Sequence, residues 1–413
     1  MAKRILYLTQ WFEPEIAPRG LKFTEGLVAH GYDVEVATGF PNYPSGKIAP
    51  GYSLSFYQLE IMRGIRVNRT YLYPSHDRSS LSRAINYISF FVSATIFCII
   101  RGRSFDAIYV YHPPITVGLA AALSSYVTKR PFLIEIQDLW PDSVVASKMS
   151  GAGVLARMLD PVCRFVYGRA ALVLGQSRTM TERLIERGVP HSKAATTFNW
   201  ADEEAVRNGG DHDLTYLEFQ GHFNFVYGGN LGSVQGLETL VRAACLASRT
   251  VPEIQLTLIG DGLERDSLAA LIAQLGAEVV KLRSGVSQSQ IGGVFAAADV
   301  LVAHLLDDPL FEVTIPSKTQ FYMAMGKPVL MGVRGESAAI IEDSGAGLSV
   351  EPQNVEAVAQ AMVHMAGLPR AELDAMGTRA RMAYEARFSF ASALSEIDGH
   401  LADVIAKASV SAS

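Results

Sequence analysis

Short apolar runs alternate with longer helical stretches along this chain, and the alternation constrains the fold more than any other feature. Such runs are typical of parallel strands that helices cover on both faces of a sheet. In the first half the predicted strands are Arg4–Thr9, Asp33–Thr38, Ala107–Tyr111, Phe132–Ile136 and Ala171–Gly175, and a helix is predicted over Gly20–His30. In the second half they are Phe223–Gly228, Gln255–Gly260, Val279–Leu282, Val300–His304, Pro328–Gly332 and Gly347–Val350. The pattern predicts an α/β protein made of two similar halves.

The polar stretch Asn199–Gln220 separates the two halves, and 413 residues are enough for two domains of ordinary size. We therefore predict a first Rossmann-like domain over residues 1–200 and a second over residues 201–385, with a cleft between them. A helical stretch from about Ala391 to Ala408 closes the chain. We assign residues 386–413 to this C-terminal helix, which can return to the first domain.

The cysteine pattern and the N-terminus indicate a reducing compartment. Cys98, Cys163 and Cys245 are scattered, which excludes a disulfide framework and a zinc knuckle. The apolar run Ile5–Leu8 is too short for a secretory signal. We therefore expect a cytoplasmic location.

One uncharged segment, Ala84–Ile100, predicts contact with a membrane surface. Its 17 residues follow Arg83 and precede Arg101 and Arg103, and the first 110 residues hold 12 Lys/Arg against 8 Asp/Glu. Spanning a bilayer takes about 20 mostly apolar residues, so an interfacial helix with arginines toward lipid phosphates is the better fit. The alternative is a helix buried against the first sheet. We expect a partly buried helix that also contacts the inner face of the plasma membrane.

A glycine-rich turn, Gly228–Gly232, directly follows the first strand of the second half. Glycines between a strand and a helix let backbone N–H groups approach a diphosphate, and the helix dipole favours its charge. The alternative is a turn with no ligand. Its position at the first turn of the second domain favours phosphate binding.

Several motifs together resemble a known family. They are Pro14–Gly20, His30–Val34, Pro41–Lys47, Gln137–Asp142, Asn199–Asp202, Gly228–Gly232, Ile259–Gly262, Ala298–Val300 and Ala324–Val329. In this order they resemble retaining glycosyltransferase family 4, whose fold is GT-B. Pro41–Lys47 and Gln137–Asp142 are similar to its WbuB-type branch, sugar transferases of O-antigen and capsule synthesis. The likeness covers nearly the whole chain.

The resemblance implies a UDP-linked nucleotide-sugar donor on the second domain, with an N-acetylamino sugar as one candidate. Its diphosphate would lie over the turn Gly229–Gly232 and its base near Arg283–Val286. Its sugar would lie near Glu312 and the turn Pro316–Lys318. The implied donor-binding residues are Gly229, Asn230, Leu231, Gly232, Gln235, Arg283, Val286, Ser317 and Lys318. Lys318 and Glu312 would also act in catalysis. Pro316 and Ser317 are expected to cap the helix that begins there.

On the first domain the resemblance implies an acceptor-side loop containing Pro18, Arg19 and Gly20. His112 and Asp138 each follow a predicted strand, at the edge of a parallel sheet where ligands gather. We predict that His112 faces the donor sugar and that Asp138 orients or deprotonates the acceptor hydroxyl. Asp142 is the alternative base.

The chain departs from the family at three positions. Asn230 and Gln235 stand where relatives often have cations, although the WbuB-type branch shares these substitutions. Phe321 replaces the glutamate that holds the donor ribose, and Glu312 lies one residue from the expected first acid. The resemblance implies a retaining, metal-independent transferase, without a cofactor or nucleic-acid partner, acting on a lipid-linked glycan. A nucleotide-sugar epimerase of the same fold and a non-catalytic partner in a glycan-assembly complex are the alternatives.

Overall fold

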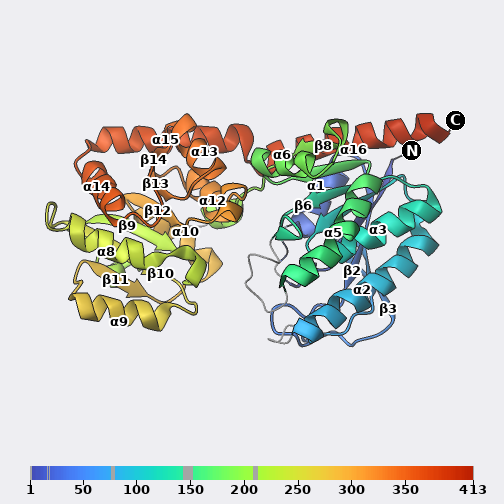
Figure 1. Ribbon diagram of the computed structural model, residues 1–413, viewed down its shortest axis with the longest axis horizontal. Helices are drawn as coiled ribbons and strands as arrows, with labels where there is room; N and C mark the ends of the chain where they lie inside the picture. The colour runs from blue at the N-terminus through green and yellow to red at the C-terminus, as the bar shows by residue number, and fades with distance from the viewer. Residues whose placement is uncertain are drawn as a thin grey trace. The chain divides into compact units, whose positions relative to one another are not determined.

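The computed structural model describes residues 2–15, 17, 19–75, 80–142, 152–207 and 213–412 (Figure 1). The chain divides into two compact units. The first contains Met1–Thr197 and Leu394–Ser413, and the second contains Phe198–Ala393. The chain therefore leaves the first unit once and returns to it within its last helix.

The first unit is an eight-stranded sheet in the order β3-β4-β2-β1-β5-β6-β7-β8, parallel except for the β3–β4 pair. Its strands are β1 (Arg4–Leu8), β2 (Asp33–Gly39), β3 (Tyr57–Met62), β4 (Ile65–Thr70), β5 (Ala107–His112), β6 (Phe132–Ile136), β7 (Leu172–Gly175) and β8 (Ala194–Thr196). Its helices are α1 (Leu21–Ala29), α2 (Ser80–Arg101), α3 (Ile115–Thr128), α5 (Ala152–Arg169), α6 (Arg178–Glu186) and most of α16 (Phe390–Ala412). The five strands predicted here are confirmed.

The sequence analysis did not predict the antiparallel hairpin β3–β4. Exposed and half-buried residues alternate along β3, so it has no continuous apolar run. The turn is Arg63-Gly64, with φ of 47° and 84°, the positive values that a tight hairpin turn requires. That dipeptide was the signal available in the sequence.

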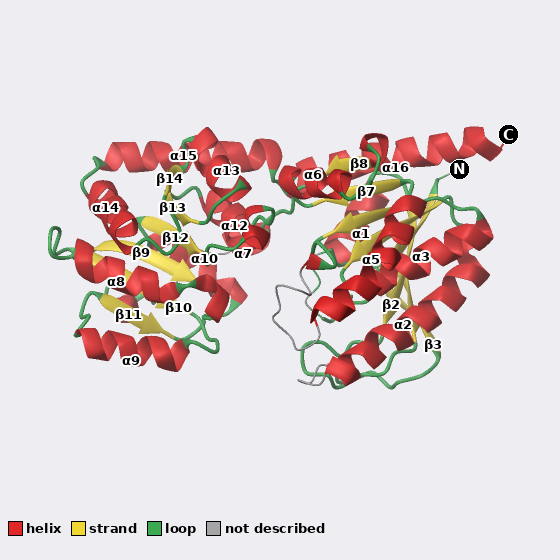
Figure 2. Cartoon of the chain, viewed as in Figure 1, coloured by secondary structure: helices red, strands yellow, loops and turns green. Residues whose placement is uncertain are grey.

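The second unit is a six-stranded parallel sheet in the order β11-β10-β9-β12-β13-β14, covered by helices (Figure 2). Its strands are β9 (Phe223–Gly228), β10 (Ile254–Ile259), β11 (Val280–Arg283), β12 (Val300–His304), β13 (Val329–Gly332) and β14 (Gly347–Ser349). Its helices are α7 (Glu203–Arg207), α8 (Leu237–Ala247), α9 (Arg265–Leu275), α10 (Gln288–Ala297), α11 (Pro309–Glu312), α12 (Ser317–Met325), α13 (Glu336–Ser344), α14 (Val355–Ala366) and α15 (Arg370–Arg387). All six predicted strands are confirmed, and so is the two-sheet α/β fold class.

Helix α2 has two different faces. Asn86, Phe90, Ala94, Phe97 and Cys98 are buried in the first unit. The opposite face carries an aliphatic stripe that is 36–73% exposed, made of Leu81, Ile85, Ile88, Val92, Ile96, Ile99 and Ile100. Among the described residues, one helix, Leu81–Ser104, is long and apolar enough to cross a membrane, and 28% of its apolar window is buried. The buried-helix alternative therefore accounts for one face of α2 only.

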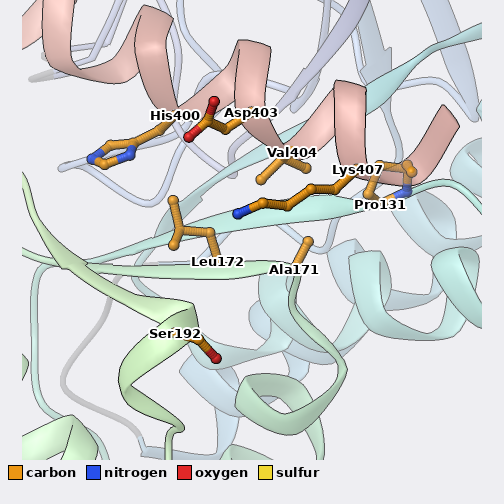
Figure 3. A pocket seen from close by; sticks show the side chains of 9 residues that line it. Pro131, Ala171, Leu172, Ser192, His400, Asp403, Val404 and Lys407 are labelled. Carbon is orange, nitrogen blue, oxygen red and sulfur yellow. The ribbon is translucent and has the colours of Figure 1, made fainter. Parts of the chain in front are cut away.

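The last helix, α16, is bonded to the first unit. The Asp398 carboxylate accepts a hydrogen bond of 2.7 Å from the Tyr32 hydroxyl and lies 3.1 Å from His30 Nδ1. A cavity of about 260 Å³ lies beside α16, where Val404 and Lys407 are opposite Ala171 and Leu172 (Figure 3). Ala171 and Leu172 stand at the start of β7, so this cavity is at the amino end of the strand. Ligands of parallel sheets gather at the other edge.

Candidate functional site

In the first unit, β5 and β6 bring His112 and Asp138 to the same edge of the sheet. The two strands pair in parallel with His112 opposite Ile136, and Asp138 follows two residues later. Both side chains therefore stand at the carboxyl ends of neighbouring strands, as the sequence predicted. Their roles in catalysis stay predictions.

The His112 ring is fully buried. Neither ring nitrogen has a hydrogen-bond partner in the part of the chain that the structure describes, and Trp140 packs edge-on at 5.8 Å between ring centroids. Burial lowers the pKa of His112 to about 3, so the imidazole is neutral at physiological pH. Two unsatisfied nitrogens in a buried ring are costly without a ligand that bonds them.

The Asp138 side chain is exposed, yet the protein around it raises the pKa of its carboxyl by desolvation. Its negative charge in turn contributes to the raised pKa values of Tyr87 and Tyr111, after the larger effect of their own burial. Asp142, the alternative base, is ion-paired with Arg187. An accessible carboxylate with a raised pKa suits proton transfer better than one held by an arginine.

Arg19 is held in a buried ion pair, and its predicted contact with an acceptor stays a prediction. The guanidinium is 1% exposed, and its Nε donates to both carboxylate oxygens of Glu135 at 3.0 and 3.1 Å. Glu135 is fully buried and also accepts from the Tyr109 hydroxyl at 2.5 Å and from Gln137 Nε2 at 2.6 Å. A charge inside the sheet needs a partner, and Glu135 takes Arg19 for that purpose.

Of the other predicted acceptor residues, Pro18 lies outside the described residues. Gly20 is buried at the start of α1, where the Glu13 carboxylate accepts from the Leu21 N–H at 2.7 Å. A Cβ at Gly20 would lie 2.1 Å from that carboxylate oxygen. Gly20 is thus explained by the cap of α1, and its contact with an acceptor stays a prediction.

In the second unit, the glycine turn after β9 uses most of its own amides. The N–H groups of Gly229, Leu231 and Gly232 donate to the carbonyls of Ile259 and Asp261 and to Gln235 Oε1. Within the described residues only the Asn230 N–H lacks a protein acceptor in this turn. Of the predicted donor-binding residues Gly229–Gly232, Asn230 is therefore the one whose N–H is left for a diphosphate, and the Gln235 side chain stabilises the turn.

Lys318 supplies positive charge beside this turn. A Cβ at Gly229 would meet Lys318 Nζ at 2.9 Å, and the ammonium lies 4.9 Å from the ring centre of Tyr227. Burial lowers the pKa of Lys318 to about 8. No carboxylate pairs with it in the described ranges. A desolvated cation without an anion is a binding site for one.

The start of α12 adds backbone donors. Pro316, not Ser317, is the N-cap residue, and no side chain caps the helix. The N–H groups of Ser317 and Lys318 have no acceptor among the described residues, whereas the Thr319 N–H bonds the Pro316 carbonyl. The predicted serine cap is wrong, but its absence leaves free amides next to the Lys318 ammonium.

The remaining predicted donor residues stand at the same edge of the second sheet. Arg283, at the end of β11, is 3.1 Å from Glu218, and Val286 is half-buried after it. Glu312 ends α11, and its backbone is so close to Gly335 that a Cβ there would lie 2.2 Å from the Glu312 carbonyl oxygen. Phe321 packs edge-on against Phe295 at 5.6 Å, so apolar contacts replace the family glutamate.

Sequence reasoning missed the buried Glu135–Tyr109–Gln137 cluster and Tyr227. Glu135 interrupts the apolar run Phe132–Ile136, which was the available signal that a buried carboxylate needs a cation. No signal identified Arg19 as that cation, because the two are 116 residues apart.

Comparisons with known proteins agree with this geometry. Residues 16–200 match the family model of the glycosyl transferase 4-like domain, and residues 222–367 match that of glycosyl transferases group 1. The chain is 25% identical to WcaI of Escherichia coli, described as a colanic acid biosynthesis glycosyl transferase, over 87% of this chain and 91% of WcaI. It is 26% identical to WbjE of Pseudomonas aeruginosa, described as a glycosyltransferase, over 63% of this chain and 66% of WbjE. HepE of Anabaena, solved with UDP and glucose, has a TM-score of 0.67 at 18% identity and covers 97% of this chain and 100% of its own.

Two parallel sheets, each with polar groups at its carboxyl edge, and these matches define the class as a GT-B glycosyltransferase. The chain belongs to glycosyltransferase family 4.

We expect Asp138→Asn to lower turnover about 100-fold, the usual scale for losing a positioned proton acceptor. The amide keeps the shape of the carboxyl group but takes no proton. Because desolvation raises the pKa of Asp138, wild-type turnover should rise with pH through that raised pKa, and the variant should lack this rise. Release of nucleoside diphosphate measures both.

The matched control is Asp142→Asn, which changes a carboxylate already paired with Arg187. Its turnover should stay within about threefold of wild type. A larger loss in Asp142→Asn than in Asp138→Asn would exchange the two assignments.

Proposed function

We propose that this protein transfers a sugar from UDP, with retention of anomeric configuration and without a metal, to a lipid-linked glycan. The acceptor lies at the inner face of the plasma membrane, and the product belongs to a surface polysaccharide. WcaI, described as acting in colanic acid biosynthesis, supports the polysaccharide, and HepE supports UDP as the nucleotide.

The observation that carries this proposal is Lys318. Its ammonium is desolvated, lacks a carboxylate among the described residues, and lies beside both the Gly229 turn and the free amides at the start of α12. A diphosphate fits this combination, because it brings negative charge and several acceptor oxygens. Charge that develops on the leaving diphosphate would be stabilised at the same place.

We infer retention from the donor site, in which Lys318 and the α12 amides would hold the departing diphosphate on one face of the sugar. The incoming hydroxyl approaches the sugar on that same face and gives its proton to Asp138. The neutral His112 ring offers a donor and an acceptor to the sugar. Lys318 supplies the countercharge that a divalent cation supplies in metal-dependent transferases.

The test incubates the full chain with a panel of UDP-sugars, with and without a chelator, and follows thermal unfolding and UDP release. UDP at 100 times its dissociation constant should stabilise the protein by about 2.7 kcal/mol. Transfer that survives chelation supports the proposal. Isomerised nucleotide sugar without an acceptor would establish an epimerase, and absence of nucleotide binding would favour the non-catalytic partner.

The membrane part of the proposal rests on α2, α3 and α5, which lie side by side on the first sheet (Figure 2). The aliphatic stripe faces outward on α2, and Val154, Met158 and Phe165 are 43–69% exposed on α5. Helices α2 and α3 contain no Asp or Glu, and α5 contains one acid against three arginines. Apolar side chains among arginines suit an anionic bilayer surface.

We expect Ile88→Ser/Ile96→Ser to weaken flotation with phosphatidylglycerol-containing vesicles about 30-fold. Both side chains are just over half exposed, so the folded state loses little, while each contributes roughly 1 kcal/mol when it enters the acyl region. Phe90 and Phe97 on the same helix are unsuitable for this test, because both are buried.

Val28→Ser/Met382→Ser is the matched control, because it removes two exposed apolar side chains from outside this helix layer. It should leave flotation unchanged. Equal flotation of both double variants and wild type would refute membrane contact through α2.

A further inference from the structure

The first half of α2 is fastened to the predicted acceptor side of the first sheet. Asn86 is 3% exposed and accepts from Gln10 Nε2 at 2.6 Å. Its amide donates to Asn42 Oδ1 at 3.3 Å and to the Tyr73 carbonyl at 2.7 Å. Gln10 and Asn42 follow β1 and β2, so these bonds hold this turn of α2 at the carboxyl ends of both strands.

Arg83 and Tyr87 lie on the same stretch of α2 as Asn86, and Asp138 is near enough to Tyr87 to affect the pKa of its hydroxyl. Tyr87 is half-buried, and burial raises the pKa of its hydroxyl; among nearby groups Arg83 lowers that pKa, while Tyr43 and Asp138 raise it. Arg83 lies one helical turn before Tyr87 on α2, and Tyr43 directly follows Asn42, to which Asn86 donates. Tyr43 also packs against Trp11, with ring centroids 5.6 Å apart.

These side chains have the chemistry of a phosphate-and-sugar site. An arginine binds phosphate oxygens with a planar pair of donors, and aromatic rings pack against sugar rings. Tyr43 is 39% exposed, and Arg83, Tyr87 and Trp11 are each half-buried, so a ligand can reach them. The Glu15 carboxylate fixes the Tyr43 loop, accepting from the N–H groups of Asn42 and Tyr43 at 2.5 Å.

The same end of α2 also leads to the aliphatic stripe. Leu81, Ile85 and Ile88 are 42–71% exposed and interleave with Arg83 and Tyr87 along the helix. One ligand with a phosphate head and an apolar tail could therefore contact both faces of a single helical turn.

We propose that Arg83, Tyr87, Tyr43 and Trp11 form the acceptor site, in which Arg83 binds the diphosphate of a lipid-linked acceptor. The acceptor sugar packs on the aromatic rings with its hydroxyl toward Asp138, and the lipid leaves along Leu81, Ile85 and Ile88. This inference rests on the proposed function and adds where the acceptor binds and which group recognises it.

The test measures binding of the full chain to three kinds of phosphatidylcholine vesicle. One is neutral, one contains a polyprenyl diphosphate, and one contains phosphatidylglycerol at equal surface charge. Wild type should prefer the diphosphate vesicles over the phosphatidylglycerol vesicles roughly tenfold, the effect of one charge-assisted contact to a diphosphate. Arg83→Gln and Arg83→Ala should abolish that preference, and Arg83→Lys should restore part of it.

Arg103→Ala is the matched control, because it removes an exposed arginine beyond the other end of α2. It should weaken binding to both anionic vesicles equally and leave the preference intact. Soluble inorganic diphosphate should compete for wild type and not for Arg83→Gln. A preference that survives Arg83→Gln, or that falls equally in Arg103→Ala, overturns the proposal.

Stabilisation of each variant by UDP is measured in parallel. A normal UDP response shows that the second unit of a variant is folded, and hydrogen exchange in β1 and β2 as slow as in wild type shows the same of the first unit. For variants that pass both checks, a retained preference counts against the acceptor site alone. If wild type does not respond to UDP, the proposed function fails, and the lipid preference is judged separately.

Discussion

Lys318→Met is expected to cost about 2–4 kcal/mol in transition-state stabilisation, a loss of roughly 30- to 900-fold in kcat/KM for the nucleotide sugar. Methionine keeps most of the side-chain bulk and removes the ammonium. Arg334, a cation that follows β13 at the carboxyl edge of the same sheet, is already 3.0 Å from Asp307 and 2.5 Å from Glu351. The turn after β9 has only the Asn230 amide free among the described residues, so most of the countercharge falls to Lys318.

The matched control is Lys327→Met. Lys327 follows α12, burial likewise lowers its pKa, and its ammonium donates to the Ala298 carbonyl at 2.9 Å. Its kcat/KM should stay within about threefold of wild type once the protein is folded. Activity of Lys318→Met within threefold of wild type would remove Lys318 from the donor site.

The same residue predicts how donor binding depends on pH. Burial lowers the pKa of free Lys318 to about 8, and a bound diphosphate favours the charged form. Charged lysine binds the anion, so affinity for UDP should be full below that pKa and fall as pH rises through and above about 8. Calorimetry should show this fall for wild type, and a flatter profile for Lys318→Met.

Arg19→Met is expected to destabilise the first unit by about 3–5 kcal/mol, because it leaves the Glu135 carboxylate buried without its cation. The Arg19 and Glu135 side chains are 2% and 0% exposed, so water cannot replace the lost contact. Hydrogen exchange of the β5 and β6 amides during urea unfolding measures the free energy of unfolding of the first unit. A probe specific to this unit is needed because the two units need not unfold together.

Arg183→Met is the control. Arg183 pairs with Glu186 at 3.0 Å on α6, and both side chains are more than half exposed, so the expected cost is at most about 0.5 kcal/mol. Replacing the pair together, Arg19→Met/Glu135→Leu, should recover much of the lost stability, because no charge then stays buried. A small effect of Arg19→Met on stability would contradict the structural role of this ion pair and favour the predicted acceptor role of Arg19.

The sequence predicted the location of a site residue wherever that residue stands next to the end of a strand or the start of a helix. His112, Asp138 and Gly229 follow strands, and all parallel strands of a sheet end at one edge, so the sequence places these residues correctly. The location of Lys318 was predictable in the same way, because it stands at the start of the helix that Pro316 precedes. What each side chain bonds to is not fixed by such positions.

Three features depended on contacts between distant segments. Arg19 belongs to a buried pair whose other member, Glu135, lies 116 residues away on a neighbouring part of the sheet. In the glycine turn, the amides of Gly229 and Leu231 donate to the carbonyls of Ile259, which ends β10, and Asp261, which follows it. Asn86 brings the start of α2, with Arg83 and Tyr87, to the acceptor edge.

The sequence by itself determined the two parallel α/β sheets, since period and apolar runs report local burial directly. It also determined that α2 carries an uncharged surface between arginines. Only the tertiary structure decided which face of α2 packs on the sheet and which stays exposed, because the polar Asn86 lies on the buried face while Ile88 and Ile96 are exposed. It likewise decided which polar groups satisfy one another and which are left for a ligand, since hydrogen bonds between distant strands and loops exist only after folding.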